Sequence, residues 1–196
     1  MTDGIAGTDG MQHIISTADL LPRRERVLDS RPVAAWLRGK SVAVTGAGGF
    51  IGAELSRQLA EMPIRMLLLI DNSEMNLYNI SRQIPNARAK FADVRDYARM
   101  MSLLNTQDVV FHAAAMKHVP ICQQNIAEAN EPNIRGTSNV LKSTSADCRV
   151  VLVSTDKAVN PSSHMGKTKA AAENLCRVTG RASIVRFGNV IGSSGS

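Results

Sequence analysis

Aromatic residues and cysteines are scarce in this chain of 196 residues. Phe, Trp and Tyr make up only 4% of the sequence, so a buried core has to be built from aliphatic side chains and methionine. Cysteine occurs three times, at Cys122, Cys148 and Cys176, an odd number without the spacing of metal ligands. A disulfide framework is therefore not expected, and each thiol is interpreted as a small buried side chain in a reducing cytoplasm.

Long apolar runs and blocks of one charge are also missing. No run approaches the ~20 residues of a membrane-spanning helix, and the N-terminus lacks the basic-then-apolar plan of a secretory signal. The formal net charge is +6, but outside residues 23–26 the Lys and Arg are dispersed, and the histidines are not spaced as metal ligands. We therefore expect a cytoplasmic protein with no membrane segment, no metal site and no nucleic acid as partner. A phosphate-rich small ligand would suit the positive charge.

The sequence pattern changes near residue 40. Residues 1–39 are predicted to be an N-terminal extension, partly disordered at its start, with a short helix near Trp36. In residues 40–196, short apolar runs alternate with amphipathic segments. The runs are 41–45, 65–70, 87–92, 108–114, 149–154 and 182–187. This alternation predicts an α/β fold, a Rossmann-like doubly wound parallel sheet of buried strands with helices on both faces.

A glycine-rich turn, TGAGGFIG at residues 45–52, follows the first expected strand. Its glycines let the chain turn sharply, bring backbone amides to a pyrophosphate and pack a helix close to the strand. The N-terminus of that helix adds positive potential. Dinucleotide binding is therefore predicted, with a merely structural glycine turn as the alternative. The predicted cofactor-binding residues of the turn are Gly46, Gly49, Phe50, Ile51 and Gly52.

Polar residues also follow the later strands. Asp71 and Asn72 lie roughly 20 residues beyond the last glycine, where a carboxylate accepts hydrogen bonds from the adenine ribose and repels a 2′-phosphate. NAD is therefore favoured over NADP. The alternative is that Asp71 or Asn72 caps the helix starting at residues 73–74, and the two roles are compatible. The other predicted cofactor contacts are Asp93, Val94, Ala113, Ala114, Ala115 and Lys117.

The fifth apolar run ends in Thr155, Asp156 and Lys157. A strand that ends in titratable side chains and leads into a helix is how an α/β enzyme presents catalytic groups at the carboxyl edge of its sheet. The alternative for Asp156 and Lys157 is a solvated pair at a strand end. On the helix that follows, Met165 and Lys169 are spaced to lie on one face. Ser162 or Ser163 is expected to cap that helix, and core packing is the alternative for Met165.

Several segments carry a family resemblance. They are TGAGGFIG, DNSEMNLY, FHAAAMKHVP, NIRGTSNV, VLVSTDKAVNPSSHMGKTKAAAE and VRFGNVIGSSGS. Together they resemble the polysaccharide-biosynthesis (CapD-like) nucleotide-sugar 4,6-dehydratases, a branch of the extended short-chain dehydrogenase/reductases. The likeness covers about residues 38–196. It implies an NAD-dependent lyase that acts on a UDP-N-acetylglucosamine-type sugar, often with inversion at C5, and a homo-oligomer. A nucleotide-sugar epimerase and a non-catalytic dinucleotide-binding fragment are the alternatives.

The resemblance also implies roles for individual residues. Asp156 and Lys157 would be the general acid and base. Burial near electron-rich groups would favour a protonated Asp156, and burial, Lys169 and the cationic nicotinamide would favour a neutral Lys157. Thr155 would hydrogen-bond the C4 oxygen. Lys169 would bind the nicotinamide ribose. The catalytic set is Thr155, Asp156, Lys157, Met165 and Lys169, and the predicted substrate contacts are Lys117, Arg186, Asn189, Ser193 and Ser194.

Three departures from the family pattern stand out. Met165 occupies the position where most extended members place a tyrosine. Glu131 and Pro132 fall in an expected helical stretch before Asn133, which resembles the family's structural asparagine behind the catalytic lysine. The family continues beyond the equivalent of Ser196 through a C-terminal substrate-binding portion. That portion is expected to be missing here.

Overall fold

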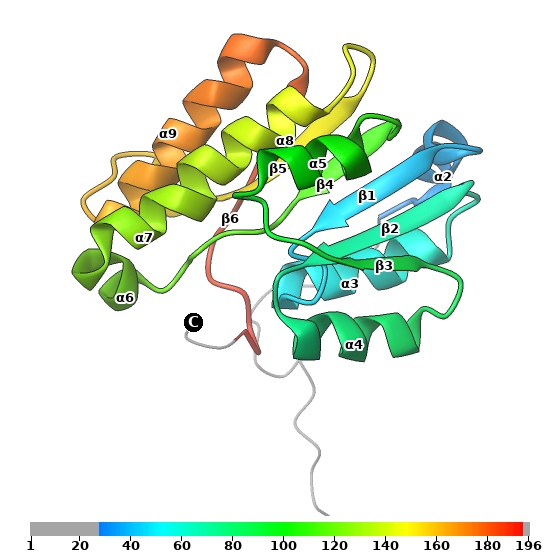
Figure 1. The fold of residues 1–196 in the computed structure, drawn as a ribbon, viewed down its shortest axis with the longest axis horizontal. Coiled ribbons are helices and arrows are strands. Elements are labelled where there is room, and N and C mark those ends of the chain that lie inside the picture. Colours follow the sequence, from blue (N-terminus) through cyan, green and yellow to red (C-terminus); the bar gives the residue numbers. More distant parts are fainter. Residues whose placement is uncertain (1–27, 194–196) are drawn as a thin grey trace, which may run out of the picture. The chain divides into compact units, whose positions relative to one another are not determined.

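The computed structural model describes residues 28–193 (Figure 1). Backbone contacts divide the chain into two units, Met1–Pro32 and Val33–Ser196. In the described residues of the first unit, the Asp29 carboxylate accepts hydrogen bonds from the backbone and the guanidinium of Arg31. The predicted disorder of the first residues lies outside the described part of the chain. The predicted domain division at residue 39 stays a prediction.

The second unit contains a six-stranded parallel sheet. Its strands are β1 (Ser41–Thr45), β2 (Met66–Asp71), β3 (Arg88–Phe91), β4 (Val109–His112), β5 (Arg149–Thr155) and β6 (Ala182–Phe187). Their order across the sheet is β3-β2-β1-β4-β5-β6, and each neighbouring pair is parallel. From β1 to β3 the strands are added toward one edge of the sheet, and from β4 to β6 toward the other. The position between β1 and β4 is therefore the switch point where open α/β sheets bind ligands. The predicted Rossmann-like, doubly wound fold is confirmed.

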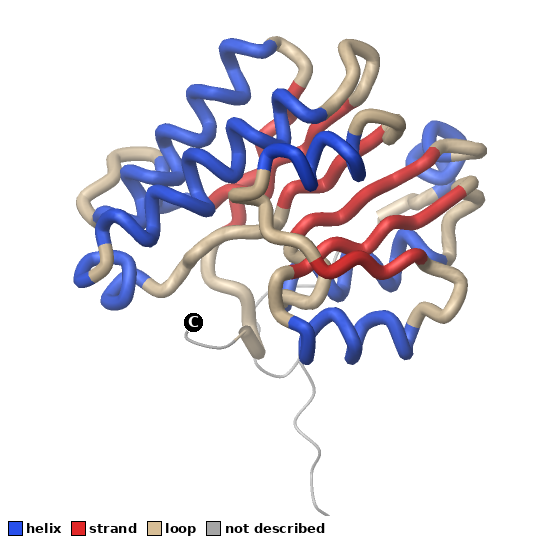
Figure 2. The backbone as a smooth tube through the Cα atoms, in the orientation of Figure 1, coloured by secondary structure: helices blue, strands red, loops and turns tan. Residues whose placement is uncertain are grey.

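Helices cover both faces of the sheet (Figures 1 and 2). The α-helices are α2 (Arg31–Leu37), α3 (Phe50–Ala60), α4 (Glu74–Gln83), α5 (Tyr97–Leu104), α6 (Val119–Gln124), α7 (Ile126–Asn130), α8 (Thr137–Ser143) and α9 (His164–Thr179). A π-helical turn, η1 (Glu131–Gly136), joins α7 to α8, and a 3₁₀ turn, η2 (Asp156–Ala158), follows β5. The short helix predicted near Trp36 is confirmed as α2. In residues 28–193 no helix has the length and apolar character to cross a membrane.

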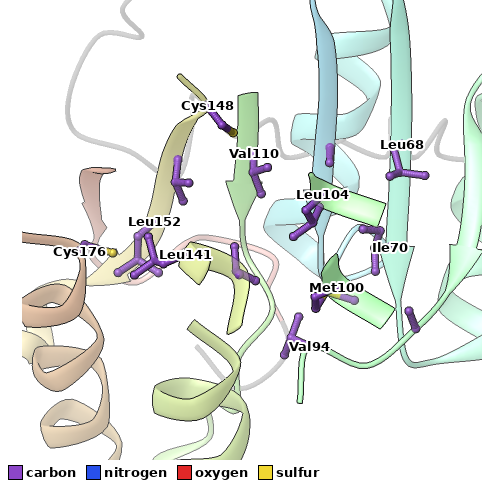
Figure 3. Close-up of a cluster of buried hydrophobic side chains, with 14 of the residues drawn as sticks. Leu68, Ile70, Val94, Met100, Leu104, Val110, Leu141, Cys148, Leu152 and Cys176 are labelled. Atoms are coloured by element: carbon purple, nitrogen blue, oxygen red, sulfur yellow. The ribbon is translucent and has the colours of Figure 1, made fainter. Parts of the chain in front are cut away.

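The alternation of side chains along the strands builds two cores. Ala43 and Leu68 face α5, α8 and α9, in a cluster that includes Met100 and Leu152 (Figure 3). Val42, Val44, Leu67 and Leu69 face the other way, in a cluster with Leu59 of α3 and Ile80 of α4. The buried residues of the second cluster are all aliphatic, and those of the first are aliphatic apart from Met100, Cys148 and Cys176, as the scarcity of aromatic residues requires.

The two edge strands differ from the prediction that every run is buried. All residues of β3 are exposed, and β6 is intermediate to exposed throughout, with Val185 42% and Phe187 37% accessible. The prediction is wrong for these strands because an edge strand has a neighbour on one side alone. The central strands β1 and β2 are buried as expected.

Pro132 lies in the first turn of the π-helical segment η1. This segment continues directly from α7, so the proline stands inside a continuous helical path, and the wider π turn accommodates its ring. On the same segment Gly136 packs against Val94, because a Cβ at this glycine would lie 2.6 Å from the Val94 side chain. The sequence departure at Pro132 is therefore absorbed by a local change of helix type.

Candidate active site

The glycine turn leads from β1 into α3 on a backbone that side chains would obstruct. Gly46 has a φ of 68°, and a Cβ there would lie 2.6 Å from the backbone nitrogen of Ala114. A Cβ at Gly52 would overlap the carbonyl oxygen of Gly46. The N-cap residue Gly49 provides no side-chain cap. The first amides of α3, from Phe50 onward, therefore point out of the helix end without side-chain cover, as phosphate binding needs.

Asp71 fastens this turn to the end of β2. Its buried carboxylate accepts hydrogen bonds from the amide of Gly48 at 2.9 Å and the amide of Ser73 at 2.8 Å. Ser73 is the N-cap of α4, and its hydroxyl accepts from the amide of Asn76. The alternative that Asp71 or Asn72 caps this helix is therefore wrong. The capping hydroxyl comes from the next residue along the chain.

The ends of β2 and β3 are linked by a second carboxylate. Asp93 accepts a hydrogen bond from the side-chain amide of Asn72 at 3.0 Å and two from the guanidinium of Arg95. The Arg95 hydrogen bond lowers the pKa of Asp93 to about 2. The next residue, Val94, is buried. Asp93 is thus engaged by protein partners, and Val94 rather than Asp93 lines the neighbouring cavity.

Two cavities that share lining residues open along the carboxyl edge of the sheet. The smaller has a volume of about 380 Å³ and the larger about 570 Å³. Predicted cofactor residues lining the smaller cavity are Gly46, Gly49, Asp71, Asn72, Val94, Ala113, Ala114 and Ala115. Those lining the larger are Gly46, Gly49, Phe50, Ile51, Gly52, Ala113, Ala115, Lys117 and Lys169. Residues predicted on separate strand ends to contact a dinucleotide therefore come together along one groove.

The polar group after β5 forms a hydrogen-bonded cluster at the larger cavity. Thr155 donates from Oγ1 to Oδ1 of Asp156 at 3.0 Å, and the ammonium of Lys157 contacts the same oxygen at 3.4 Å. Lys157 also donates to Oδ1 of Asn189 at 3.0 Å. Thr155, Lys157 and Asn189 line the cavity, whereas Asp156 is not among its lining residues.

The burial predicted for this acid–base pair is not found. The side chains of Asp156 and Lys157 are 59% and 43% exposed. The hydrogen bond from Thr155, followed by that from Lys157, holds the pKa of Asp156 below its usual range. The expectation that both side chains are buried is therefore wrong for this structure. Both side chains stand at a strand end that is open to solvent.

Helix α9 brings Met165 and Lys169 to the same cavity. Ser163 is its N-cap and accepts from the amide of Gly166, which confirms one of the two predicted caps. Lys169 is 7% exposed and donates to the carbonyl of Val153 at 2.7 Å. Burial lowers the pKa of Lys169 to about 8.

Met165 packs in the core and also forms part of the cavity wall. It is 4% exposed and packs with Cys122 and Ala129 in a small apolar cluster. It also lines the larger cavity. A thioether cannot exchange a proton, so this position adds an apolar wall and no acid–base group.

Asn133 connects this helix to the loop after β4. Its side chain accepts from the amide of Met116 at 2.8 Å, and donates to the carbonyl of Met116 and to the hydroxyl of Thr168, each at 2.9 Å. Thr168 is the neighbour of Lys169. Asn133 therefore holds the lysine's helix against the cavity wall, in the position that the resemblance implies.

The predicted substrate contacts are only partly at the cavity. Lys117, Asn189 and Ser193 line it. The Arg186 guanidinium is instead paired with Glu173, and Ser194 lies outside the described residues. A substrate contact by Arg186 stays a prediction. Sequence reasoning missed Glu173, although its place four residues after Lys169 puts it on the same helix face.

The family model described as "Polysaccharide biosynthesis protein" matches residues 42–196. The chain belongs to this family. The resemblance derived from its motifs is thereby confirmed. Within residues 28–193 no group of three or more His, Cys, Asp or Glu side chains is arranged to hold a metal ion.

Relatives of this polysaccharide-biosynthesis chain include dehydratases and epimerases. It is 38% identical to the probable polysaccharide biosynthesis protein EpsC of Bacillus subtilis, over 96% of this chain and 34% of the relative. It is 33% identical to a UDP-N-acetylglucosamine 4,6-dehydratase (inverting) of Campylobacter jejuni, over 81% and 51%. A UDP-glucose 4-epimerase of Rickettsia bellii is 35% identical, over 80% and 51%. The chain thus spans a third to a half of the length of these relatives.

Solved structures show the same fold. Pen from Bacillus thuringiensis has a TM-score of 0.77 and 35% identity, over 82% of this chain and 53% of that one. The dTDP-glucose 4,6-dehydratase DesIV from Streptomyces venezuelae, a double mutant with NAD and DAU bound, has a TM-score of 0.66 and 26% identity, over 74% and 54%.

Proposed function

We propose that this chain is the dinucleotide-binding and catalytic part of an NAD-dependent nucleotide-sugar 4,6-dehydratase, a lyase that acts on a UDP-N-acetylglucosamine-type sugar in polysaccharide biosynthesis. The observation that carries the proposal is that Thr155 and Lys157, bonded to Asp156, share one cavity with the glycine turn and Lys169. Epimerisation at C4 needs transient oxidation and a base for the C4 hydroxyl proton. Dehydration also needs a base for the C5 proton and an acid for the C6 hydroxyl. The name of the Campylobacter jejuni relative supports the same reaction and substrate.

The site fits NAD. Gly46 and Gly52 leave no room for a Cβ, so the turn presents bare backbone to a pyrophosphate. Each carboxylate oxygen of Asp71 accepts one backbone hydrogen bond and keeps acceptor capacity for a ribose hydroxyl. Its charge would repel the 2′-phosphate of NADP. DesIV, whose structure holds NAD, has the same fold, which supports this assignment.

Lys169 would hold the nicotinamide ribose. Its ammonium donates a hydrogen bond to the carbonyl of Val153, and an ammonium has three donors. Small side chains at Ala113 and Ala115 let the ring lie close to β4. When bound, NAD supplies reversible hydride acceptance, which makes the C5 proton of the oxidised sugar acidic.

Asp156 and Lys157 would form the acid–base pair for the C5 proton and the C6 hydroxyl. Both side chains are exposed to solvent, and the hydrogen bonds from Thr155 and Lys157 hold the pKa of Asp156 below its usual range. The contact at 3.4 Å gives the proton a direct path between them.

Thr155 would manage the C4 hydroxyl in place of the tyrosine that Met165 replaces. Its hydroxyl lines the cavity and donates to Asp156, so a proton taken from C4 has a carboxylate within reach. The predicted substrate contacts Lys117, Asn189 and Ser193 line the same cavity and would face the diphosphate. The homo-oligomer and the cytoplasmic location stay predictions.

Two other functions are distinguishable by experiment. A 4-epimerase is favoured by the Rickettsia bellii relative. The other alternative is that the chain binds a dinucleotide but catalyses no reaction by itself. Purified chain with NAD and UDP-N-acetylglucosamine should form a 4-keto-6-deoxy product, seen by NMR. An epimer at C4 would support the first alternative, and NAD binding without product the second.

Variants make this test specific. Lys157→Ala should abolish product and leave NAD binding intact. Lys167→Ala removes an exposed lysine from the adjacent helix and should leave both unchanged. Equal activity of the two variants would refute the role of Lys157.

A further inference from the structure

A buried carboxylate, Glu173, lies behind the cluster of Thr155, Asp156 and Lys157. It is 1% exposed and stands on α9, one turn beyond Lys169. Neither cavity is lined by it. A buried charge is maintained only when it is paired and hydrogen-bonded, so its partners show what it holds in place.

Glu173 binds one residue from each of three elements. It accepts from the hydroxyl of Ser154 on β5 at 2.7 Å, and from Nε and Nη2 of Arg186 on β6 at 2.9 and 2.6 Å. Arg177, from its own helix, donates at 2.7 Å. The hydrogen bonds from Arg186, followed by that from Ser154, lower the pKa of Glu173 to about 2. The carboxylate is therefore ionised at neutral pH and joins α9 to two strands.

The two strand partners are level with each other in the sheet. Ser154 pairs with Arg186 in the β5–β6 register, and the next pair is Thr155 with Phe187. Beyond Phe187 the chain reaches Asn189, whose side chain accepts from the Lys157 ammonium at 3.0 Å. Glu173 thus holds β5 at Ser154 and β6 at Arg186. The next residue of β5 is Thr155, and Asn189 follows three residues after Arg186.

We propose that Glu173, through its bidentate pair with Arg186, is a positioning residue that sets the place of Asn189 and so of the Lys157 ammonium. An effect of Glu173 on catalysis rests on the proposed function, because Lys157 is the base there. Its effect on the position of the Lys157 ammonium does not depend on catalytic activity. Bidentate guanidinium–carboxylate pairs fix orientation as well as distance, and an error of about 1 Å at a reacting group can cost ~100-fold in rate.

Arg177 provides a matched control. It pairs with the same Oε2 atom as Arg186, and the two arginine side chains are 52% and 39% exposed. Arg177 also donates to Asn174 on α9 and remains on that helix. Replacing either arginine removes one cation from Glu173. Only Arg186 connects the carboxylate to the strand that leads to Asn189.

The test follows the Lys157 side chain by NMR, with the lysines labelled at their amines. Asn189→Ala defines the shift change when the Asn189 contact is lost. Arg186→Gln and Glu173→Gln should reproduce at least half of that change, and Arg186→Lys should restore part of the wild-type signal. Arg177→Gln should leave Lys157 at its wild-type shift, with thermal unfolding confirming that each variant is folded.

Two results would overturn the proposal. One is an equal change in the Lys157 chemical shift in Arg177→Gln and Arg186→Gln. That result would mean that Lys157 responds to the charge near Glu173 and not to the connection through β6. The other is a wild-type Lys157 shift in folded Arg186→Gln. If Glu173→Gln does not fold, the two arginine variants decide. Where the chain turns over, Arg186→Gln should lower kcat about ten-fold at constant KM for NAD, and the NMR result is independent of that activity.

Discussion

The hydroxyl of Thr45 lies 2.7 Å from Nδ1 of His112, in the fully buried space between β1 and β4. On the other side of the ring, Nε2 lies 3.0 Å from Oγ1 of Thr137. Thr137 donates its only hydroxyl proton to the carbonyl of Asn133 at 2.7 Å. Oγ1 of Thr137 must therefore accept from His112, which places the ring proton on Nε2 and leaves Nδ1 to accept from Thr45. The glycine turn and the Asn133 segment are thus joined through one neutral imidazole.

Acidification should destabilise the protein through this histidine. Burial, with a contribution from Lys169, lowers the pKa of His112 from 6.5 to about 3. Between these values the unfolded chain binds a proton that the folded chain excludes, so stability falls as pH falls. Below pH 6.5 we expect the free energy of unfolding to fall by about 1.4 kcal/mol per pH unit. Urea unfolding between pH 7 and 5 measures this slope.

A histidine variant provides the control for that slope. His112→Gln should flatten it, whereas His118→Gln, at an exposed position, should not. Measurement above pH 5 keeps the carboxylates out of the titration. A wild-type slope near zero would show that His112 is protonated without loss of the fold.

Gly46→Ala should weaken NAD binding at least ten-fold. The backbone there has a φ of 68°, and the new methyl group would meet the backbone of Ala114, so the turn must move. Strain and overlap together should destabilise the fold by about 2 kcal/mol or more. Calorimetric titration with NAD and thermal unfolding measure the two effects.

Gly180 separates the effect of backbone strain from that of the close approach. It has a φ of 65°, and no distant part of the chain lies within 4 Å of the position that an added methyl group would take. Gly180→Ala should destabilise by about 1 kcal/mol and leave NAD affinity unchanged. Equal losses of NAD affinity in the two variants would contradict the cradle assigned to Gly46.

Lys169→Met should stabilise the free protein while it weakens NAD binding. The pKa of Lys169 is lowered from 10.5 to about 8, so at neutral pH the fold bears a buried charge that becomes less unfavourable only as pH rises from 8 to 10.5. Removing the charge and losing the hydrogen bond to Val153 should give a net gain of about 2 kcal/mol. Urea unfolding and NAD titration test the pair of effects, with Lys167→Met as the exposed control.

Asp71→Asn should shift the cofactor preference toward NADP. The carboxamide removes the charge that repels a 2′-phosphate, and its NH₂ group would oppose the amide of Gly48 or Ser73, at a cost of about 1–3 kcal/mol. The ratio of the dissociation constants for NAD and NADP measures the shift. Glu74→Gln removes a nearby exposed charge without touching the glycine turn and should leave this ratio unchanged.

Features that depend on chain neighbours were predictable from the sequence alone. The six strands, the glycine turn and the cap at Ser163 follow from apolar spacing, glycine placement and a hydroxyl before a helix. The parallel order then brings Thr155 and Gly46 to the same edge of the sheet, because every strand ends there. Fold class and the location of the candidate site therefore required no knowledge of long-range contacts.

The tertiary structure alone decided which partner each polar group takes and how much water reaches it. Asp156 is exposed where burial was expected, and the Arg186 guanidinium is paired with Glu173, which sequence reasoning missed. Burial and pairing depend on atoms from elements far apart in the chain, so no local pattern encodes them. The spacing of residues determined where the chemistry is placed, and three-dimensional packing determined the charge states and contacts of the groups that would perform it.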